Sequence, residues 1–110
     1  MQIKKTYLNI KPELLYDELR DLVVKQGTTL GEKKFETYSL PTDSSTFISR
    51  ATLTFLTGGR ECLRAHLVGS AIGDIKLVID INEDLFPAEK IKALREDLDF
   101  IFDSYEVKPQ

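Results

Sequence analysis

Residues 87–105 of the chain read PAEKIKALREDLDFIFDSY, and this stretch decides the fold. Its apolar residues recur at alternating spacings of three and four, which places them on one stripe of a helix, with charged residues on the remainder. A long amphipathic helix needs an apolar surface to cover, so the rest of the chain must supply one. The stripe consists of Ile91, Leu94, Leu98, Ile101 and Tyr105.

The stretch from 33 to 81 has a different pattern, because apolar and polar residues alternate between short turn signals. Alternation with a period of two is typical of half-buried strands. The separators 57–59 and 71–73 each have three residues with glycine third, which predicts hairpin loops between antiparallel strands. Partner numbers would then sum to 116 across the first hairpin and to 144 across the second. The strands are expected at 33–40, 46–56, 60–70 and 74–81.

The N-terminal quarter adds one strand and one helix. Residues 2–9 are expected to form the strand. A leucine-rich stripe follows Pro12, and proline is favoured in the first turn of a helix. Gly27 is a natural stop, because glycine readily adopts the left-handed conformation that ends many helices. The first helix is therefore expected at 12–26.

Composition is that of an ordinary globular domain, with 42% hydrophobic and 30% charged residues among 110. A chain of this length forms one domain, residues 1–110, with a single core. The net charge of −3 gives no field that would attract polyanions, which argues against nucleic acid as a partner. The lone Cys62 cannot form an internal disulfide, and we find neither a signal-peptide core nor about 18 consecutive apolar residues. We expect a cytoplasmic protein without a membrane span.

The order strand, helix, four strands, helix resembles the helix-grip topology of a TATA-binding-protein repeat. The START-like and polyketide-cyclase-like ligand-binding domains are larger elaborations of that topology. The resemblance covers the whole chain through element order alone, and because no residue motif of these families is present, no functional residue is carried over. It implies that the first strand pairs with the last. The predicted fold class is α+β: a five-stranded antiparallel sheet of order 1-5-4-3-2 with two helices on one face.

Candidate metal and catalytic motifs fail on their spacing. Residues 80–84 alternate oxygen ligands like the start of an EF-hand loop, but Leu85 and Ile91 stand where that loop needs glycine and glutamate. Cys62 and His66 cannot act as nucleophile and base, because four residues of a strand span about 13 Å. The sequence predicts no metal, no cofactor and no catalytic residue. It favours a non-catalytic protein over an enzyme, although a carboxylate site assembled by the fold stays open.

The middle of the predicted apolar face carries small or polar side chains, which we expect to lie under the C-terminal helix. Either the helix packs closely over them, the commoner outcome in a domain of this size, or a cavity remains for an apolar small molecule. The ligand-binding families of the same topology place their pocket in this space. Binding of an apolar small molecule in such a cavity is the leading hypothesis of function. Its candidate residues are Thr37, Ser49, Ala51, Ala65, Leu94 and Leu98.

The opposite face of the sheet offers an alternative function. If the loop at 41–45 gives partners that sum to 86, Tyr38 lies opposite Ile48, which in turn lies opposite Val68. An apolar row across three strands is typical of an interface. The alternative function is therefore a protein-interaction or homodimerisation module that uses this face. Its candidate residues are Tyr38, Ile48, Arg50, His66 and Val68.

Overall fold

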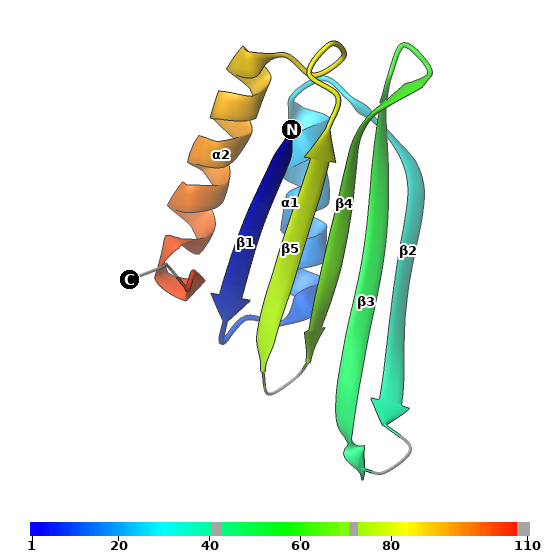
Figure 1. Cartoon of the computed structure of the whole chain (residues 1–110), viewed down its shortest axis with the longest axis vertical. Coiled ribbons are helices and arrows are strands. Elements are labelled where there is room, and N and C mark those ends of the chain that lie inside the picture. Colours follow the sequence, from blue (N-terminus) through cyan, green and yellow to red (C-terminus); the bar gives the residue numbers. More distant parts are fainter. Residues whose placement is uncertain (41–42, 71–72, 108–110) are drawn as a thin grey trace.

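A computed structural model describes residues 1–40, 43–70 and 73–107 of the chain. Five strands form one antiparallel sheet in the order β1-β5-β4-β3-β2, and two α-helices cover one face (Figure 1). The predicted α+β class and strand order are confirmed. The elements are β1 (Gln2–Leu8), α1 (Pro12–Lys25), β2 (Thr29–Leu40), β3 (Asp43–Thr57), β4 (Arg60–Ser70), β5 (Asp74–Ile81), α2 (Ala88–Phe102) and a short 3₁₀ helix η1 (Asp103–Tyr105).

The first helix begins and ends at residues suited to those positions. Pro12 stands in the first turn, where its missing N–H removes no helical hydrogen bond. Gly27 follows the last turn with a φ of +92°, in the left-handed region that favours glycine. The apolar stripe turns inward and is buried. It consists of Pro12, Leu15, Leu19, Leu22 and Val23.

Two of the three predicted strand registers are confirmed, those between β4 and β5 and between β2 and β3. The loop predicted at 71–73 lies partly outside the described residues. The register predicted between β3 and β4 is wrong, because Leu53 lies opposite Ala65 rather than Leu63. A shift of two residues keeps each side chain on its predicted face, since side chains alternate with a period of two. The apolar face therefore survives the correction.

A tighter turn and a bulge cause this change of register in the β3–β4 hairpin. Gly58 and Gly59 have φ values of +58° and +78°, which fits a two-residue turn of left-handed residues. The pairing then shifts between Phe55 and Leu56, which leaves Cys62 as the extra residue of the bulge. Simple alternation would place Cys62 on the open face of the sheet, but its side chain is only 1% exposed.

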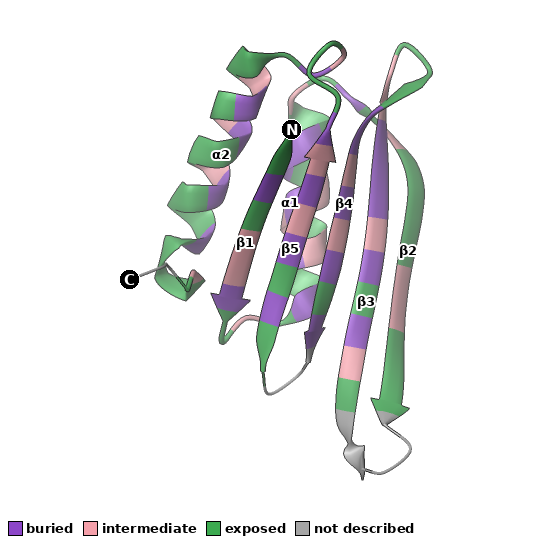
Figure 2. Cartoon of the chain, viewed as in Figure 1, coloured by how far each residue is buried: buried purple, intermediate pink, exposed green. Residues whose placement is uncertain are grey.

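The core lies between the sheet and the helices, and buried segments alternate along the strands (Figure 2). The predicted stripe of α2 is partly wrong at its C-terminal end. Ile101 and Tyr105 are exposed, whereas Phe102 is buried. Phe102 faces inward because its ring packs against that of Tyr7 on β1, with the ring centroids 5.6 Å apart. The buried residues of α2 are Ile91, Leu94, Leu98 and Phe102.

The helix that approaches β3 and β4 most closely is α1. Small buried side chains, Ala51 on β3 and Ala65 on β4, allow a helix to come close to the sheet. Our expectation that these residues lie under the C-terminal helix is therefore wrong. The second helix, α2, lies toward the β1 edge (Figure 1). Lys25 of α1 and Asp97 of α2 join the two helices through an ion pair of 3.4 Å.

Candidate ligand-binding hollow

The helices do not cover the full length of the sheet. The 14 residues of α1 rise about 21 Å, whereas the 15 residues of β3 extend about 50 Å. The β2–β3 hairpin accordingly runs past the other strands at the end where α1 begins (Figure 1). A hollow of about 980 Å³ lies at this uncovered end. Its volume is near the upper end of the range for small-molecule pockets, roughly 300 to 1,000 Å³.

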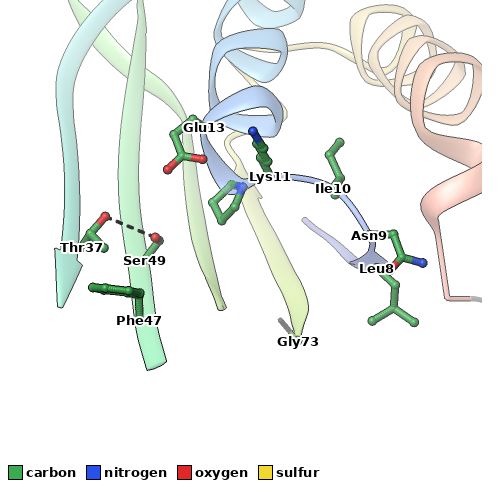
Figure 3. A pocket seen from close by; sticks show the side chains of 10 residues that line it. Leu8, Asn9, Ile10, Lys11, Glu13, Thr37, Phe47, Ser49 and Gly73 are labelled. Carbon is green, nitrogen blue, oxygen red and sulfur yellow. Dashed lines mark hydrogen bonds between the residues drawn. The ribbon is translucent and has the colours of Figure 1, made fainter. Parts of the chain in front are cut away.

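Three segments of the chain line the hollow (Figure 3). One wall is the connection from β1 into the first turn of α1. The opposite wall is formed by β2 and β3, and the residue before β5 contributes to the rim. The lining residues are Leu8, Asn9, Ile10, Lys11, Pro12, Glu13, Thr37, Phe47, Ser49 and Gly73.

The wall between β1 and α1 depends on an unusual backbone conformation. Asn9 has a φ of +63°, a left-handed conformation that asparagine tolerates better than most residues. This residue turns the chain out of β1, and Pro12 starts α1 three residues later. The short connection between them places Ile10 and Lys11 beside the hollow.

Apolar side chains are left partly uncovered around the hollow. Leu8 and Phe47 are each 41% exposed, although Phe47 lies on the same face of β3 as the core residues. Ile10 is half-buried and packs against the core from the other wall. Fully burying a leucine or phenylalanine side chain is worth about 1.5 to 3 kcal/mol, so a ligand that covers these groups would gain free energy.

Polar groups give the hollow its hydrogen-bonding capacity. Thr37 Oγ1 and Ser49 Oγ lie 3.3 Å apart on adjacent strands, and either hydroxyl can donate to the other (Figure 3). Each hydroxyl can both donate and accept, so the pair can meet a ligand group of either kind. Lys11 and Glu13 add opposite charges at the start of α1. The lining therefore suits a molecule that is mainly apolar and has a polar end.

The structure brings together only part of the predicted pocket. Thr37 and Ser49 line the hollow, but the hollow lies beside the start of α1 and not between the sheet and the C-terminal helix, where the sequence predicts the pocket. The other four predicted residues belong to the buried core and do not line it. They are Ala51, Ala65, Leu94 and Leu98.

Sequence reasoning missed most of the remaining lining residues. Leu8 ends β1, Ile10 and Lys11 lie in the connection that follows, and Glu13 lies in the first turn of α1; this part of the chain carries no recognisable motif. Phe47 is likewise absent from the candidate residues of the predicted pocket. The signal that could have found them is the difference in length between a helix of about four turns and a strand of 15 residues.

The outer face of the sheet does not carry the predicted straight row of apolar residues. Tyr38 lies opposite Ile48 as expected, but Ile48 lies opposite Ser70, and Val68 lies opposite Arg50. The predicted pairing of Ile48 with Val68 is therefore wrong. Tyr38 and Val68 are both exposed. His66 is half-buried, and its Nδ1 lies 3.5 Å from Thr52 Oγ1.

Comparisons with protein-family models, with curated protein sequences and with solved structures found no match for this chain. Within residues 1–40, 43–70 and 73–107, no helix has the length and apolar character needed to cross a membrane.

Proposed function

We propose that the protein is a small non-catalytic binding domain that holds a largely apolar small molecule in the hollow beside the start of α1. The observation that carries this proposal is the hollow of about 980 Å³, in which exposed Leu8 and Phe47 accompany a pair of hydroxyls. The apolar part of the ligand would cover Leu8, Ile10 and Phe47. Its polar end would hydrogen-bond to Thr37 and Ser49.

A binding role is favoured over catalysis by the chemistry of the lining. A hydroxyl nucleophile needs an adjacent general base to activate it. Thr37 and Ser49 hydrogen-bond to each other, and the described residues that line the hollow include neither histidine nor cysteine; their carboxylate, Glu13, forms no hydrogen bond with either hydroxyl. We also propose that the chain belongs to the helix-grip topology, because the pairing of β1 with β5 follows the order that this topology implies.

The test is titration with anilinonaphthalene sulfonate, a fluorescent molecule with apolar rings and one charged end. We expect saturable binding with one site per chain. Thr37→Leu fills part of the hollow and removes a hydroxyl, so it should weaken binding about fivefold or more, and Phe47→Ala should weaken it by removing an apolar wall. Thr52→Leu is the matched control, because it makes the same change on the opposite face of the sheet.

The proposal fails if the folded wild type shows no saturable fluorescence change. It also fails if Thr37→Leu and Phe47→Ala bind as tightly as Thr52→Leu, since the probe would then sit elsewhere. Thermal melts of all variants establish that each is folded at the temperature of the titration.

We place this activity in the cytoplasm. Cys62 is a free and buried cysteine in a chain without a second one, which suits a reducing compartment.

A further inference from the structure

The two edge strands of the sheet differ in whether another segment of the chain pairs with them. At the β1 edge, Val107 N donates a hydrogen bond to Thr6 O at 2.8 Å, and Glu106 forms a β-bridge with Tyr7. The chain itself therefore covers part of this edge. At the other edge, β2 pairs with β3, and within the described part of the chain no further strand lies beyond it (Figure 1). The outer edge of β2 thus offers backbone groups for pairing with another strand.

The side chains along β2 have an ordered arrangement of charge. Lys34 and Glu36 lie on the outer face, one on each side of Phe35 along the strand, and their charged groups are 2.7 Å apart. The side chain of Lys34 is 64% exposed and that of Glu36 is 33% exposed. Phe35 lies on the opposite face and packs edge-on against Tyr16 of α1, with the ring centroids 5.3 Å apart. A bulge between Leu30 and Lys33 ends the regular stretch.

We propose that the β2 edge binds the β2 edge of a second copy of this chain, antiparallel and about a twofold axis through Phe35. In this register Lys34 of each copy lies opposite Glu36 of the other. Directly opposed residues have Cβ atoms about 4.5 to 5.5 Å apart. The same two residues within one strand are two positions, or about 6.6 Å, apart. In the dimer, the backbone of Lys34 is therefore closer to the backbone of Glu36 in the partner than to the backbone of Glu36 in its own strand.

The neighbouring registers do not offer this complementarity. A twofold axis through Lys34 places Lys34 against itself and Glu36 against Glu32, and an axis through Glu36 places Glu36 against itself. Like charges directly opposite each other destabilise strand pairing. Of these three registers the charge pattern of β2 favours the one about Phe35, in which residues 33–37 of the two copies face each other over about 17 Å. The product is a continuous ten-stranded sheet with closed twofold symmetry.

A charge-swap experiment tests both the edge and the register. We expect sedimentation to show the wild type in a concentration-dependent equilibrium between monomer and dimer. Lys34→Glu and Glu36→Lys each place like charges opposite each other twice, so each should raise the dimer dissociation constant about tenfold or more. Lys4→Glu is the matched control, because it makes the same charge change on the outer face of β1 and should leave the dimer unchanged.

Two further combinations of these charge changes make the test specific to this register. A mixture of Lys34→Glu and Glu36→Lys chains should form a heterodimer, because every opposed pair then has opposite charges. The double variant Lys34→Glu/Glu36→Lys should form homodimers again. Lys34 lies at an exposed edge, so Lys34→Glu should keep the wild-type melting temperature within a few degrees. Glu36→Lys places a lysine opposite Arg50 of the same chain and should lower the melting temperature slightly. Thermal melts establish that each variant is folded.

Three results would overturn the proposal. The first is a wild type that stays monomeric at high micromolar concentration. The second is a dimer that the single charge changes do not weaken, and the third is a mixture that fails to form the heterodimer. A dimer that is insensitive to these changes but is lost in Ile48→Lys would assign the contact to the outer face instead. Phe47→Ala, which removes an apolar wall of the hollow and lies on β3 rather than on the β2 edge, should leave dimerisation unchanged, so failure of one proposal does not imply failure of the other.

Discussion

Lys5 and Glu106 are 101 residues apart in the chain, yet they form an ion pair of 3.2 Å whose side chains are 16% and 10% exposed. Lys5 Nζ also lies 3.0 Å from Asp99 Oδ1 on α2. Burial lowers the pKa of Lys5, but hydrogen bonds to Asp99 and Glu106 outweigh it and raise the pKa above its ordinary value of 10.5. The strand β1 and the end of the chain are therefore joined by a partly buried charge cluster.

This cluster predicts a loss of stability at high pH. A lysine with a raised pKa in the folded state contributes fully below its ordinary pKa, and the contribution is lost as the pH rises through the folded value. Lys5→Met should cost about 1 to 2 kcal/mol at neutral pH, because Glu106 loses its cation in a poorly solvated place. Urea unfolding should show this difference shrink above about pH 10.5. A difference that is constant with pH would mean that the charge of Lys5 contributes nothing.

Tyr7→Phe should stabilise the protein. The phenol oxygen of Tyr7 is buried and has no hydrogen-bond partner among the described residues. Burial raises the pKa of Tyr7, and the nearby carboxylates of Glu106 and Asp99 raise it further. Removing an unpaired buried hydroxyl should increase the free energy of unfolding by about 1 kcal/mol, while the ring contact with Phe102 is kept.

Equilibrium unfolding at neutral pH is the measurement, with Tyr16→Phe as the control at a partly exposed tyrosine. A less stable Tyr7→Phe variant would show that this hydroxyl has a hydrogen-bond partner in solution, such as a buried water.

Leu98→Ala and Ile101→Ala should separate the two sides of α2. Leu98 is fully buried, and its truncation should cost about 2 to 5 kcal/mol. Ile101 is 37% exposed, so its truncation should cost less than about 1 kcal/mol. Denaturant unfolding measures both. Equal losses would mean that Ile101, rather than Phe102, belongs to the core.

Ala51→Leu should act on packing and not on the hollow. Ala51 is buried where α1 lies closest to β3, so added volume should destabilise the fold by about 1 to 3 kcal/mol. Thr37→Leu, on the exposed wall of the hollow, should cost less than about 0.5 kcal/mol. Thermal melts distinguish the two. An Ala51→Leu variant as stable as the wild type would reveal empty volume beneath α1.

The order of β2 to β5 and most of their register could be predicted because consecutive hairpins depend on local alternation and on turn residues, whereas the place of β1 beside β5 followed only from the resemblance to the helix-grip topology. The register of the β3–β4 hairpin could not be predicted in this way. The sequence Thr57-Gly58-Gly59-Arg60 fits either a two-residue or a three-residue loop, and the choice moves the register of the strand. The bulge at Cys62 depends on contacts with the partner strand, which no local pattern reports.

The end of α2 and the hollow could not be predicted for a different reason. Ile101 and Phe102 follow Leu98 by three and four residues, so the helical period permits either of them to face inward. The choice is made by Tyr7, which lies on another element. The hollow depends in turn on how far β3 extends past α1, and its walls, near Ile10 and Phe47, come from distant parts of the chain.

The pairing of β1 with β5 has a consequence for the order in which the protein folds. The strands β2 to β5 are consecutive hairpins, whereas Ile3 pairs with Ile79, which lies about two thirds of the chain length away. Contacts of such wide separation carry the largest loop-closure entropy and form late. During synthesis β1 is therefore made before its partner strand, and until β5 is made β1 stays unpaired with Ile3 and Tyr7 exposed to solvent. We expect the adjacent lysines at positions 4 and 5, which keep this segment charged, to protect it from aggregation until β5 is made.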